Sequence, residues 1–409
     1  MKILYLHQYF NTPSMSGITR SYEMARRLVQ RGHEVHMITA DCTREGGGWH
    51  ETVESGIHVH WIPVAYANQM SFARRIRAFL EFAWFSGRRA ARQQADLVFA
   101  TSTPLTIALP AVYAARKLRV PMVFEVRDLW PEVPIALGAL RSRWSIAAAR
   151  RLERFAYAHA AHVVALSPGM RDGIVSTGYP AERVTVVPNA CDVELFRVPE
   201  AQGEAFRRAH GWLGQRPLVL YGGTLGLVNG VDYLARVAAA ALARDPEVRF
   251  LVVGSGKQYE KVRDEARRLG VLDRNFFMLP PLPKANMPAV LSAADLATSL
   301  FIGLKALETN SANKLFDALA AGRPVAVNHG GWLAELIERT GCGLTLDPSN
   351  PQAAAERIVG ALGDPGWKAR ARAAARRLAD TELNREYLFE RWQAAVLGAA
   401  SPGLLRRAA

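Results

Sequence analysis

The sequence predicts the α/β fold class, with two doubly wound domains, and three observations support this prediction. Its 409 residues exceed what one hydrophobic core of ordinary size holds. Half of the residues are hydrophobic and 22% are charged, a balance typical of folded globular proteins. Strand-like apolar runs alternate with helix-like segments from the first residue, which is typical of a parallel sheet covered by helices on both faces.

The first domain is expected over residues 1–190. An apolar strand opens the chain, and an amphipathic helix follows it and is closed by Gly32. Later strands are expected at HEVHMITA, DLVFATST, PMVFEVRD, HVVALS and RVTVVPNA. A helix or a turn follows each of them, as a doubly wound sheet requires.

The polar residues 191–216 lack the alternating apolar pattern and are expected to form an interdomain connection. The alternation then restarts and predicts a second domain over residues 217–375. Its strands are expected at PLVLYGGT, VRFLVVGSG, NFFMLPPL, DLATSLF, PVAVNHGG and GLTLDP. Residues 376–409 are expected to belong to a long C-terminal helix that crosses back to the first domain.

The composition limits the possible partners and the compartment. A net charge of +14 and a pI near 10 favour anionic partners such as phosphorylated substrates, acidic lipids or nucleic acid. The N-terminal segment resembles a core strand rather than a signal peptide, and the three cysteines lack metal-binding or redox spacing. No run of about 18 uncharged apolar residues occurs, so we expect a cytoplasmic protein without a membrane span.

Arginine and aromatic residues alternate in residues 74–94. We expect an amphipathic helix that lies on the inner face of the cytoplasmic membrane. Its apolar face would hold Ile76, Phe79, Leu80, Phe82 and Ala83, and its basic face Arg75, Arg89 and Arg92. The alternative is an ordinary domain helix whose aromatic side chains pack inward.

Glycines occur at three points where a strand gives way to a helix, which is where free backbone N–H groups bind phosphate. These turns contain Ser16 and Gly17, then Gly223 and Thr224, and then Gly254. Glycine also ends strands for steric reasons, so each turn alone has two explanations.

Residues 308–331 combine a polar loop with a short helix that Gly322 and Pro324 end before the next strand. Lys314 and Asp317 lie in the first turns of this helix. A lysine there meets an unfavourable helix dipole unless an anion neutralises it. The alternative is a solvated lysine and a carboxylate favoured by the dipole.

This segment resembles the donor-binding motif of glycosyltransferase family 4, whose members are retaining enzymes of the GT-B fold. Further similarity lies in the motifs ALSPGM, VVPNACD, YGGTLGLVNGVDYL and AAGRP. The chain is most similar to the bacterial O-antigen and capsule branch, which includes fucosamine transferases. The resemblance implies two Rossmann-like domains that face a central cleft.

The resemblance also assigns roles to residues. It places Asp317 where the second glutamate of the Glu-x7-Glu pattern binds the donor ribose, and Gly17 in the loop that faces the diphosphate. Thr309 stands in the first glutamate's position and Glu308 one residue early, which makes a deoxy or acetamido sugar more plausible than glucose or mannose.

The family's diphosphate-binding Arg and Lys correspond to Thr224 and Asn229, which carry no charge. Lys314 is therefore expected to supply the positive charge, together with backbone N–H groups from Ser311 to Asn313. The other glycine turns, at Gly223 and Gly254, are expected to contribute to the same donor site.

In the first domain, Arg127 and Asp128 follow a buried strand. The resemblance places them at the cleft, where Asp128 would orient or deprotonate the acceptor hydroxyl and Arg127 replaces a histidine. The structural alternative is a salt bridge between the two side chains.

Together these patterns and the resemblance predict a glycosyltransferase that moves a sugar from a nucleotide diphosphate donor to a lipid-linked saccharide in surface polysaccharide synthesis. The donor is expected to be UDP-linked. No Asp-x-Asp sequence occurs, so neither a metal ion nor another cofactor is expected. One alternative is a nucleotide-sugar epimerase of the same fold. The other is a basic nucleic-acid-binding protein, although no zinc, RRM or helix-turn-helix pattern occurs.

Overall fold

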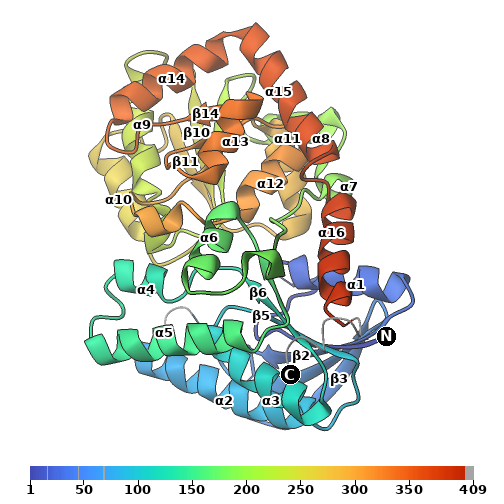
Figure 1. The fold of residues 1–409 in the computed structure, drawn as a ribbon. Coiled ribbons are helices and arrows are strands. Elements are labelled where there is room, and N and C mark those ends of the chain that lie inside the picture. The colour runs from blue at the N-terminus through green and yellow to red at the C-terminus, as the bar shows by residue number, and fades with distance from the viewer. Residues whose placement is uncertain (16, 45, 68–69, 401–409) are drawn as a thin grey trace. The chain divides into compact units, whose positions relative to one another are not determined.

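The computed structural model describes residues 1–15, 17–44, 46–67 and 70–400, and the chain folds into two compact units. The first unit holds Met1–Pro188 and the chain from Leu388 onward, and the second holds Asn189–Tyr387. Each unit is built on one sheet with helices packed against it (Figure 1).

The first sheet has eight strands in the order β3-β4-β2-β1-β5-β6-β7-β8. All neighbours pair in parallel except β3 and β4, which are antiparallel. The strands are β1 (Lys2–Leu6), β2 (Glu34–Asp41), β3 (His50–Glu54), β4 (Ile57–Pro63), β5 (Leu97–Thr101), β6 (Met122–Val126), β7 (His162–Ala165) and β8 (Val184–Val186). The helices are α1 (Arg20–Gln30), α2 (Phe72–Ala90), α3 (Ala108–Leu118), α4 (Glu132–Ala136), α5 (Arg143–Ala158) and α6 (Pro168–Ser176).

The antiparallel β3–β4 hairpin was not predicted from the sequence. Its two-residue turn places Ser55 and Gly56 at φ values of 51° and 82°, which suit a tight hairpin between right-twisted strands. Burial alternates along β3, as expected for a strand at the edge of the sheet with one face toward water.

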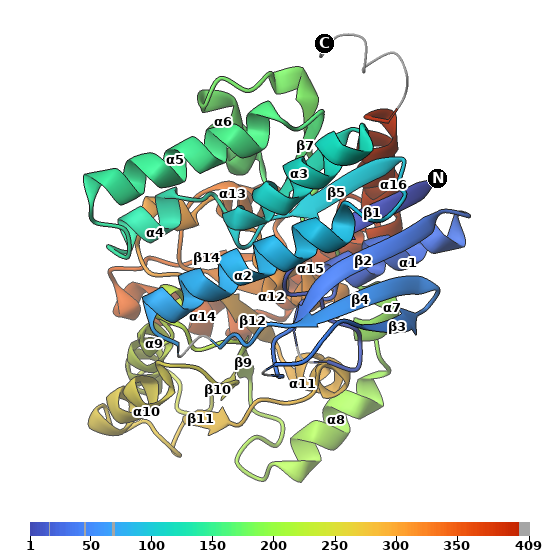
Figure 2. The ribbon, with the colours of Figure 1, turned by 90° about the horizontal axis from the view of Figure 1, so that it is seen from below.

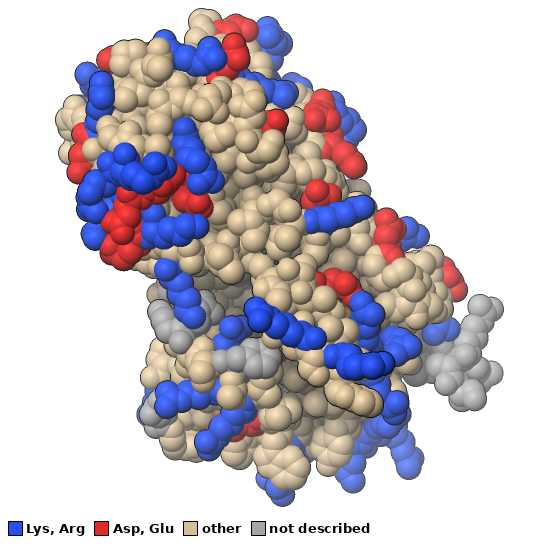
Figure 3. All heavy atoms as spheres, turned by 90° about the vertical axis from the view of Figure 1, so that its left-hand side faces the viewer, with Lys and Arg blue, Asp and Glu red and all other residues tan. Residues whose placement is uncertain are grey.

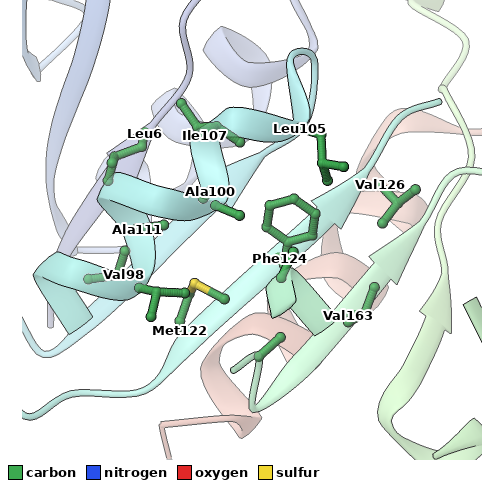
Figure 4. Close-up of a cluster of buried hydrophobic side chains, with 14 of the residues drawn as sticks. Leu6, Val98, Ala100, Leu105, Ile107, Ala111, Met122, Phe124, Val126 and Val163 are labelled. Atoms are coloured by element: carbon green, nitrogen blue, oxygen red, sulfur yellow. The ribbon is translucent and has the colours of Figure 1, made fainter. Parts of the chain in front are cut away.

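The core of the first unit lies between the central strands and the helices that cover them. The central strands β5 and β6 are buried along their whole length, which explains their unbroken apolar sequence. Figure 4 shows Phe124 of β6 among aliphatic side chains from neighbouring strands and the 105–111 segment. Helix α16 (Arg385–Gly398) adds Trp392, whose ring lies 5.0 Å from that of Phe99.

The second sheet has six parallel strands in the order β11-β10-β9-β12-β13-β14. The strands are β9 (Leu218–Gly222), β10 (Arg249–Val253), β11 (Phe276–Leu279), β12 (Leu296–Ser299), β13 (Val325–Val327) and β14 (Gly343–Thr345). The helices are α7 (Val193–Phe196), α8 (Glu200–Ala209), α9 (Asp232–Leu242), α10 (Tyr259–Arg268), α11 (Met287–Ala293), α12 (Asn313–Ala320), α13 (Trp332–Thr340), α14 (Pro351–Gly363) and α15 (Pro365–Asp380). All six strands predicted for this domain are present.

Two predicted segments differ from the structure. Residues 191–216, which were expected to connect the domains, contain α7 and α8 and belong to the second unit, where Gly203 lets α8 approach the backbone of α11. A β-carbon on Gly203 would lie 2.6 Å from the Ser292 carbonyl carbon. The long C-terminal helix is divided into α15 and α16, because the Asn384 side chain accepts hydrogen bonds from the Glu386 and Tyr387 N–H groups and starts a new helix.

The three cysteines are free thiols, of which Cys191 and Cys342 are buried and Cys42 is half-buried. Within the described part of the chain, no helix is both long and apolar enough to cross a membrane.

Candidate active site

Each sheet has one point where the strand order reverses, and ligands of doubly wound proteins bind outside the carboxyl ends of the strands there. In the second unit, β9 stands between β10 and β12, so the reversal lies between β9 and β12. In the first unit, β1 stands between β2 and β5, so the reversal lies between β1 and β5. These two edges are the natural places to look for binding residues.

Lys314 lies at the β9–β12 edge, over the turn that follows β9. A β-carbon built on Gly223 would come 3.2 Å from Lys314 Cε, so the lysine stem covers this glycine. Lys314 Nζ lies 5.3 Å from the centre of the Tyr221 ring and 5.9 Å from that of Phe301. The ammonium is therefore held over two aromatic rings at the carboxyl ends of β9 and β12.

The environment of Lys314 disfavours its charge while no anion is bound. Burial lowers the pKa of Lys314 to about 8, and the nearby Asp317 carboxylate opposes this shift. Lys314 also lies in the first turn of α12, whose N-terminus receives no side-chain cap from the described residues. The lysine and the helix dipole together make a positive site that an anion would stabilise.

Asn328 fixes the position of Phe301. Its side-chain oxygen accepts a hydrogen bond from the Phe301 N–H at 2.9 Å, and its amide group donates to the Phe301 carbonyl at 3.0 Å. Both bonds are buried, so they hold the residues after β12 against the end of β13. The ring beneath the Lys314 ammonium is thus part of a rigid edge.

Glu308 packs against the glycine turn that follows β13. A β-carbon on Gly330 would lie 3.2 Å from Glu308 Oε1, and one on Gly331 would collide with the Glu308 carbonyl. His329 precedes this turn, and its ring lies 4.9 Å from that of Phe301. Glu308 and His329 therefore lie near the same edge as Lys314.

Asp317 lies one turn after Lys314 on α12. Burial raises the pKa of Asp317 to about 6, while Lys284 and Arg385 oppose the shift. No ion pair joins Asp317 to Lys314 among the described residues. The Asp317 carboxylate is therefore ionised near neutral pH although it forms no ion pair with Lys314. In this state it can accept hydrogen bonds.

The glycines and polar residues expected near the diphosphate have identifiable local contacts. Gly254 lies against the Gly223 carbonyl, where a β-carbon would collide, so it serves loop packing. The Thr224 carbonyl accepts a hydrogen bond from the Tyr221 hydroxyl at 2.7 Å. The Asn229 side chain accepts one from the Gly226 N–H at 3.3 Å and so closes the same loop.

The loop before α12 is also tied locally. Thr309 Oγ1 donates to the Ala306 carbonyl at 3.2 Å. The Ser311 hydroxyl and carbonyl accept hydrogen bonds from Asn189 at 3.2 and 2.6 Å. Asn313 is the first residue of α12 and is half-buried. The structure thus gathers Gly223, Glu308, Asn313, Lys314 and Asp317 around α12, whereas the side chains of Thr309 and Ser311 are engaged elsewhere.

In the first unit, polar residues follow β1, β5 and β6 at the same edge. Arg127 Nη1 lies 3.2 Å from His7 Nε2, and the Arg127 N–H donates to the Ser102 hydroxyl at 2.9 Å. Thr103 Oγ1 donates to Asp128 Oδ2 at 3.0 Å. The alternative of an Arg127–Asp128 salt bridge is wrong, because within the described residues Arg127 pairs with His7 and Asp128 with Thr103.

Burial governs the charges at this edge. It lowers the pKa of His7 well below its usual range, and the positive charge of Arg127 acts in the same direction. It also lowers the pKa of Arg127. Because an arginine can only donate, His7 Nε2 must accept, and the neutral ring carries its proton on Nδ1.

Gly17 also lies in the first unit, after β1. A β-carbon on it would lie 2.6 Å from Asn11 Nδ2, so a close contact explains this glycine. Ser16, which was expected to share its role, lies outside the described residues.

Sequence reasoning missed several residues at these two edges. They are His7 and Gln8 after β1, Phe301 after β12, and Asn328 and His329 after β13. Gln8 is fully buried, and neither polar atom of its side chain has a partner among the described residues. For the polar members of this set, the available signal was a polar residue soon after a buried strand, whereas Phe301 resembles a core residue in the sequence.

The arginine-rich segment forms α2, but its faces differ from the prediction. Phe79, Phe82 and Ala83 are buried in the core, and Arg89 pairs with Glu51. Arg75 lies over the Tyr66 ring at 5.8 Å. The prediction that Phe79, Phe82 and Ala83 face the membrane is therefore wrong, whereas Leu80 of the expected apolar face is exposed.

Another face of α2 remains exposed beside α3 and α5, and the three helices lie side by side in Figures 1 and 2. Its exposed apolar side chains are Leu80, Trp84 and Phe85 of α2, Leu109 and Tyr113 of α3, and Trp144 of α5. Trp84 is 63% exposed, Trp144 is 80% exposed, and Arg88 lies over the Trp84 ring at 5.1 Å. We call these residues, with Arg74, Arg77 and Arg88, the basic-aromatic surface.

Most of the net positive charge belongs to the first unit. It contains 26 Lys and Arg against 15 Asp and Glu, whereas the second unit contains 25 against 22. On the face drawn in Figure 3, most of the charged side chains of the first unit are basic. In the second unit, Arg236, Lys261 and Arg268 alternate with acidic residues of α9 and α10.

Two family models match the chain. The model described as a glycosyl transferase 4-like domain matches residues 17–190, and the model described as glycosyl transferases group 1 matches residues 216–364. WcaI of Escherichia coli K12, named as a colanic acid biosynthesis glycosyl transferase, is 25% identical over 403 residues. This match covers 93% of the chain and 97% of WcaI.

Solved structures with the same fold confirm the predicted GT-B architecture of two Rossmann-like domains. Anabaena HepE in complex with UDP and glucose has a TM-score of 0.71 and 18% identity, covering 97% of this chain and 100% of HepE. WaaG, a glycosyltransferase involved in lipopolysaccharide biosynthesis, has a TM-score of 0.70 and 20% identity, with coverage of 97% and 100%.

Proposed function

Because the chain belongs to the GT-B glycosyltransferases that combine these two domains, we propose that it transfers a sugar from a UDP-linked donor to a lipid-linked saccharide. We propose retention of configuration and a product that enters a bacterial surface polysaccharide. The names of WcaI and WaaG, for colanic acid and lipopolysaccharide biosynthesis, support that destination. The family match favours this function over an epimerase and over a nucleic-acid-binding protein.

The position of Lys314 over Gly223 is the observation that carries the donor assignment. It joins a cation, a helix N-terminus and a turn without a side chain at the β9–β12 reversal, where a doubly wound sheet binds its ligand. HepE was solved with UDP and glucose, which supports a uridine nucleotide.

Lys314 would also assist cleavage of the bond between the sugar and the diphosphate. As the bond between the sugar and the diphosphate breaks, negative charge builds on the leaving oxygen. Lys314 and the α12 N–H groups would stabilise this charge, and preorganised groups of this kind are usually the largest catalytic term. Since a protein cation supplies the positive charge, the site we propose needs no metal ion.

Asp317 would bind the ribose of the donor. Its carboxylate is ionised above a pKa of about 6 and can accept hydrogen bonds from two vicinal hydroxyls. In the first unit, the bond from Thr103 fixes the Asp128 carboxylate, which would orient the acceptor hydroxyl beside the cationic Arg127. A retaining enzyme needs no strong base for this step.

The basic-aromatic surface would bind the inner face of the cytoplasmic membrane. Its exposed aromatic side chains can enter the interface between head groups and acyl chains, and its arginines can contact anionic head groups. Such binding would place the enzyme where lipid-linked acceptors occur. Arg75 and Arg89, which contact Tyr66 and Glu51, take no part in this proposal.

Thermal unfolding with nucleotides, followed by a transfer assay, tests the proposal. UDP or a UDP-sugar at 100 times its Kd should stabilise the protein by about 2.7 kcal/mol. The same donor should convert a lipid-linked saccharide to a larger glycolipid in excess EDTA. If no nucleotide stabilises the protein, the proposed donor site is contradicted. Loss of transfer in EDTA would contradict the proposal that the site needs no metal ion. Hydrolysis of the donor without a glycolipid product would contradict the proposed acceptor.

A further inference from the structure

Arg323 is a buried arginine at the amino-terminal edge of the second sheet, the edge opposite to that of Lys314. It stands between the C-terminal end of α12 and the start of β13, and it is 7% exposed. Its Nη2 donates a hydrogen bond to the Ser292 hydroxyl at 3.4 Å, and its Nε has no partner among the described residues. None of the described carboxylates forms an ion pair with it. Buried charges are normally paired, and the charge of Arg323 is not.

Asp295 is an acid whose charge acts on Arg323, but its carboxylate is already occupied. Its Oδ1 accepts a hydrogen bond from Arg372 at 2.9 Å. Its Oδ2 accepts one from Arg207 at 2.9 Å and one from the Leu218 N–H at 3.0 Å. One carboxylate thus serves two other arginines and a backbone group, so it does not compensate Arg323.

Helix α15 brings further positive charge to the turn that holds Arg323. Arg376 lies over this turn, since a β-carbon built on Gly322 would come 2.8 Å from Arg376 Nε. Arg372 lies one helical turn earlier, and its side chain is 33% exposed. A buried guanidinium, a half-buried one and an exposed one are thus gathered between α15 and the end of α12.

The charges around Arg323 do not balance. Burial lowers the pKa of Arg323 to about 10, and the positive charges of Arg372 and Arg376 act in the same direction. The negative charges of Asp295 and Glu200 oppose this shift, and Glu200 forms no ion pair among the described residues. An anion at this edge would therefore lower the electrostatic cost of keeping Arg323 charged.

We propose that Arg323, Arg372 and Arg376 bind a phosphate group at this edge, at a site separate from the donor site. Each guanidinium presents a planar fork of N–H donors that suits the oxygens of a phosphate. The group belongs either to inorganic phosphate or to a soluble phosphorylated metabolite. Because α12 begins near Lys314 and ends beside Arg323, the site lies at the far end of the helix that carries the donor lysine. This inference does not depend on the proposed function.

Calorimetry with inorganic phosphate tests the proposal. The wild type should bind phosphate at low salt with a Kd of about 1 mM or below. Arg376→Gln should weaken this binding roughly tenfold and Arg323→Gln by at least as much, because each loses a charge-assisted bond. Arg370→Gln is a matched control on the same helix, since Arg370 is exposed beside Asp364, and it should bind phosphate as the wild type does. Tighter binding of glucose 6-phosphate, lost in the same variants, would identify a metabolite as the source.

Lys314→Ala separates this site from the donor site, which also attracts phosphate. Binding that persists in Lys314→Ala and is lost in Arg323→Gln would support the proposal. Binding lost in Lys314→Ala but kept in Arg323→Gln and Arg376→Gln would overturn it and leave the donor assignment intact. A wild type that binds no phosphate up to about 10 mM would overturn it too. So would equal weakening by Arg370→Gln, since attraction would then depend on net charge alone.

Thermal unfolding distinguishes a ligand-binding role of Arg323 from a structural one. In the structural alternative, Arg323 interacts with the partial negative charge at the C-terminal end of α12. Arg323→Gln would then lower the Tm and leave phosphate affinity unchanged, which would overturn the proposal. If Arg323 serves a ligand, the variant loses an unpaired buried charge, and the Tm of the ligand-free protein should rise by about 2–4 °C. Arg376→Gln, at an exposed position, still provides the binding test should Arg323→Gln fail to fold.

Discussion

The Lys314 side chain covers Gly223, and a β-carbon at position 223 would lie 3.2 Å from Lys314 Cε. The two residues are 91 positions apart, yet they meet because β9 and β12 are neighbours and α12 follows β12. The glycine gives the lysine stem its place, and the rings of Tyr221 and Phe301 hold the ammonium. The cation is therefore in position before the donor binds.

Replacing Lys314 should weaken donor binding while the protein stays folded. Lys314→Ala removes a charge-assisted bond to the diphosphate worth about 1.5–3 kcal/mol, so UDP affinity should fall roughly 10- to 150-fold. Lys314→Arg keeps the charge and should lose less. Calorimetry measures the UDP affinity, and circular dichroism shows whether the variant is folded. An unchanged UDP affinity in a folded Lys314→Ala protein would mean that Lys314 does not bind the diphosphate.

The pKa of Lys314 predicts opposite pH trends for binding and for stability. Because its pKa in the folded protein is about 8, UDP affinity should fall as the pH rises above 8 and the ammonium is lost. The unfolded chain holds this proton up to about pH 10.4, so the lysine makes the free protein more stable as the pH rises through the same range. Titration of UDP binding from pH 7 to 9.5 checks the first trend, and Lys314→Arg should flatten it.

The parallel sheets could be predicted because buried parallel strands are apolar along their whole length, as in β5 and β6. The hairpin was missed because β3 is polar and only alternately buried. Helix α8 was missed because its packing depends on Gly203 rather than on an apolar stripe. Periodicity detects apolar burial, whereas these elements rest on close backbone approach and on a turn.

The candidate site could be predicted only in part, for a related reason. Lys314 was found because a lysine in the first turn of a helix conflicts with the helix dipole. The partner of Arg127 was missed because His7 lies 120 residues away and adjacent sequence suggested Asp128 instead. Phe301 and Asn328 resemble core residues in the sequence, and their role depends on which strands are neighbours.

Gly223→Ala should impair the donor site through Lys314. Gly223 has φ of +145°, which an alanine adopts only with strain, and the new methyl group would press on the lysine stem. We expect UDP affinity to fall by about tenfold, as for partial displacement of one charged contact. Gly178→Ala is a matched control, since Gly178 has φ of +95° and a β-carbon built on it would meet no atom within 4 Å. A similar loss of affinity in both variants would assign the effect to general backbone strain.

Asp317→Asn should stabilise the free protein and weaken ribose binding. Burial raises the pKa of Asp317 to about 6, so the folded state binds more protons than the unfolded chain between pH 3.8 and 6, and stability falls as the pH rises through this range. At pH 7 the variant should therefore unfold at a higher temperature, with a gain of up to about 3 kcal/mol.

Binding of UDP and of its 2′,3′-dideoxy analogue separates the ribose contact of Asp317 from the rest of the site. The variant should bind UDP roughly tenfold more weakly but the analogue with unchanged affinity. Equal losses for both nucleotides would contradict the assignment of Asp317 to the ribose.

The basic-aromatic surface should bind anionic vesicles, and of the apolar face expected from the sequence it retains Leu80. Wild type should float with vesicles of phosphatidylglycerol and phosphatidylcholine at low salt and less at high salt, because exposed charges are screened within about 10 Å at 0.1 M. Replacing Arg77 and Arg88 by glutamine should lower the partition coefficient about 30-fold, at about 1 kcal/mol for each arginine. A double variant with Leu80→Ser and Trp84→Ser should also lower the partition coefficient, because less apolar surface enters the membrane interface. This decrease should persist at high salt.

The second unit offers a control with the same change in charge. Arg208 and Arg267 are exposed there beside acidic residues of their own helices, so replacing both by glutamine should leave flotation unchanged. If this control loses binding as strongly as the Arg77 and Arg88 variant, attraction depends on net charge alone and the α2, α3 and α5 helices have no special role. If only the surface variants lose binding, and they still transfer sugar to a short soluble acceptor, the surface serves membrane attachment and is separate from the chemistry.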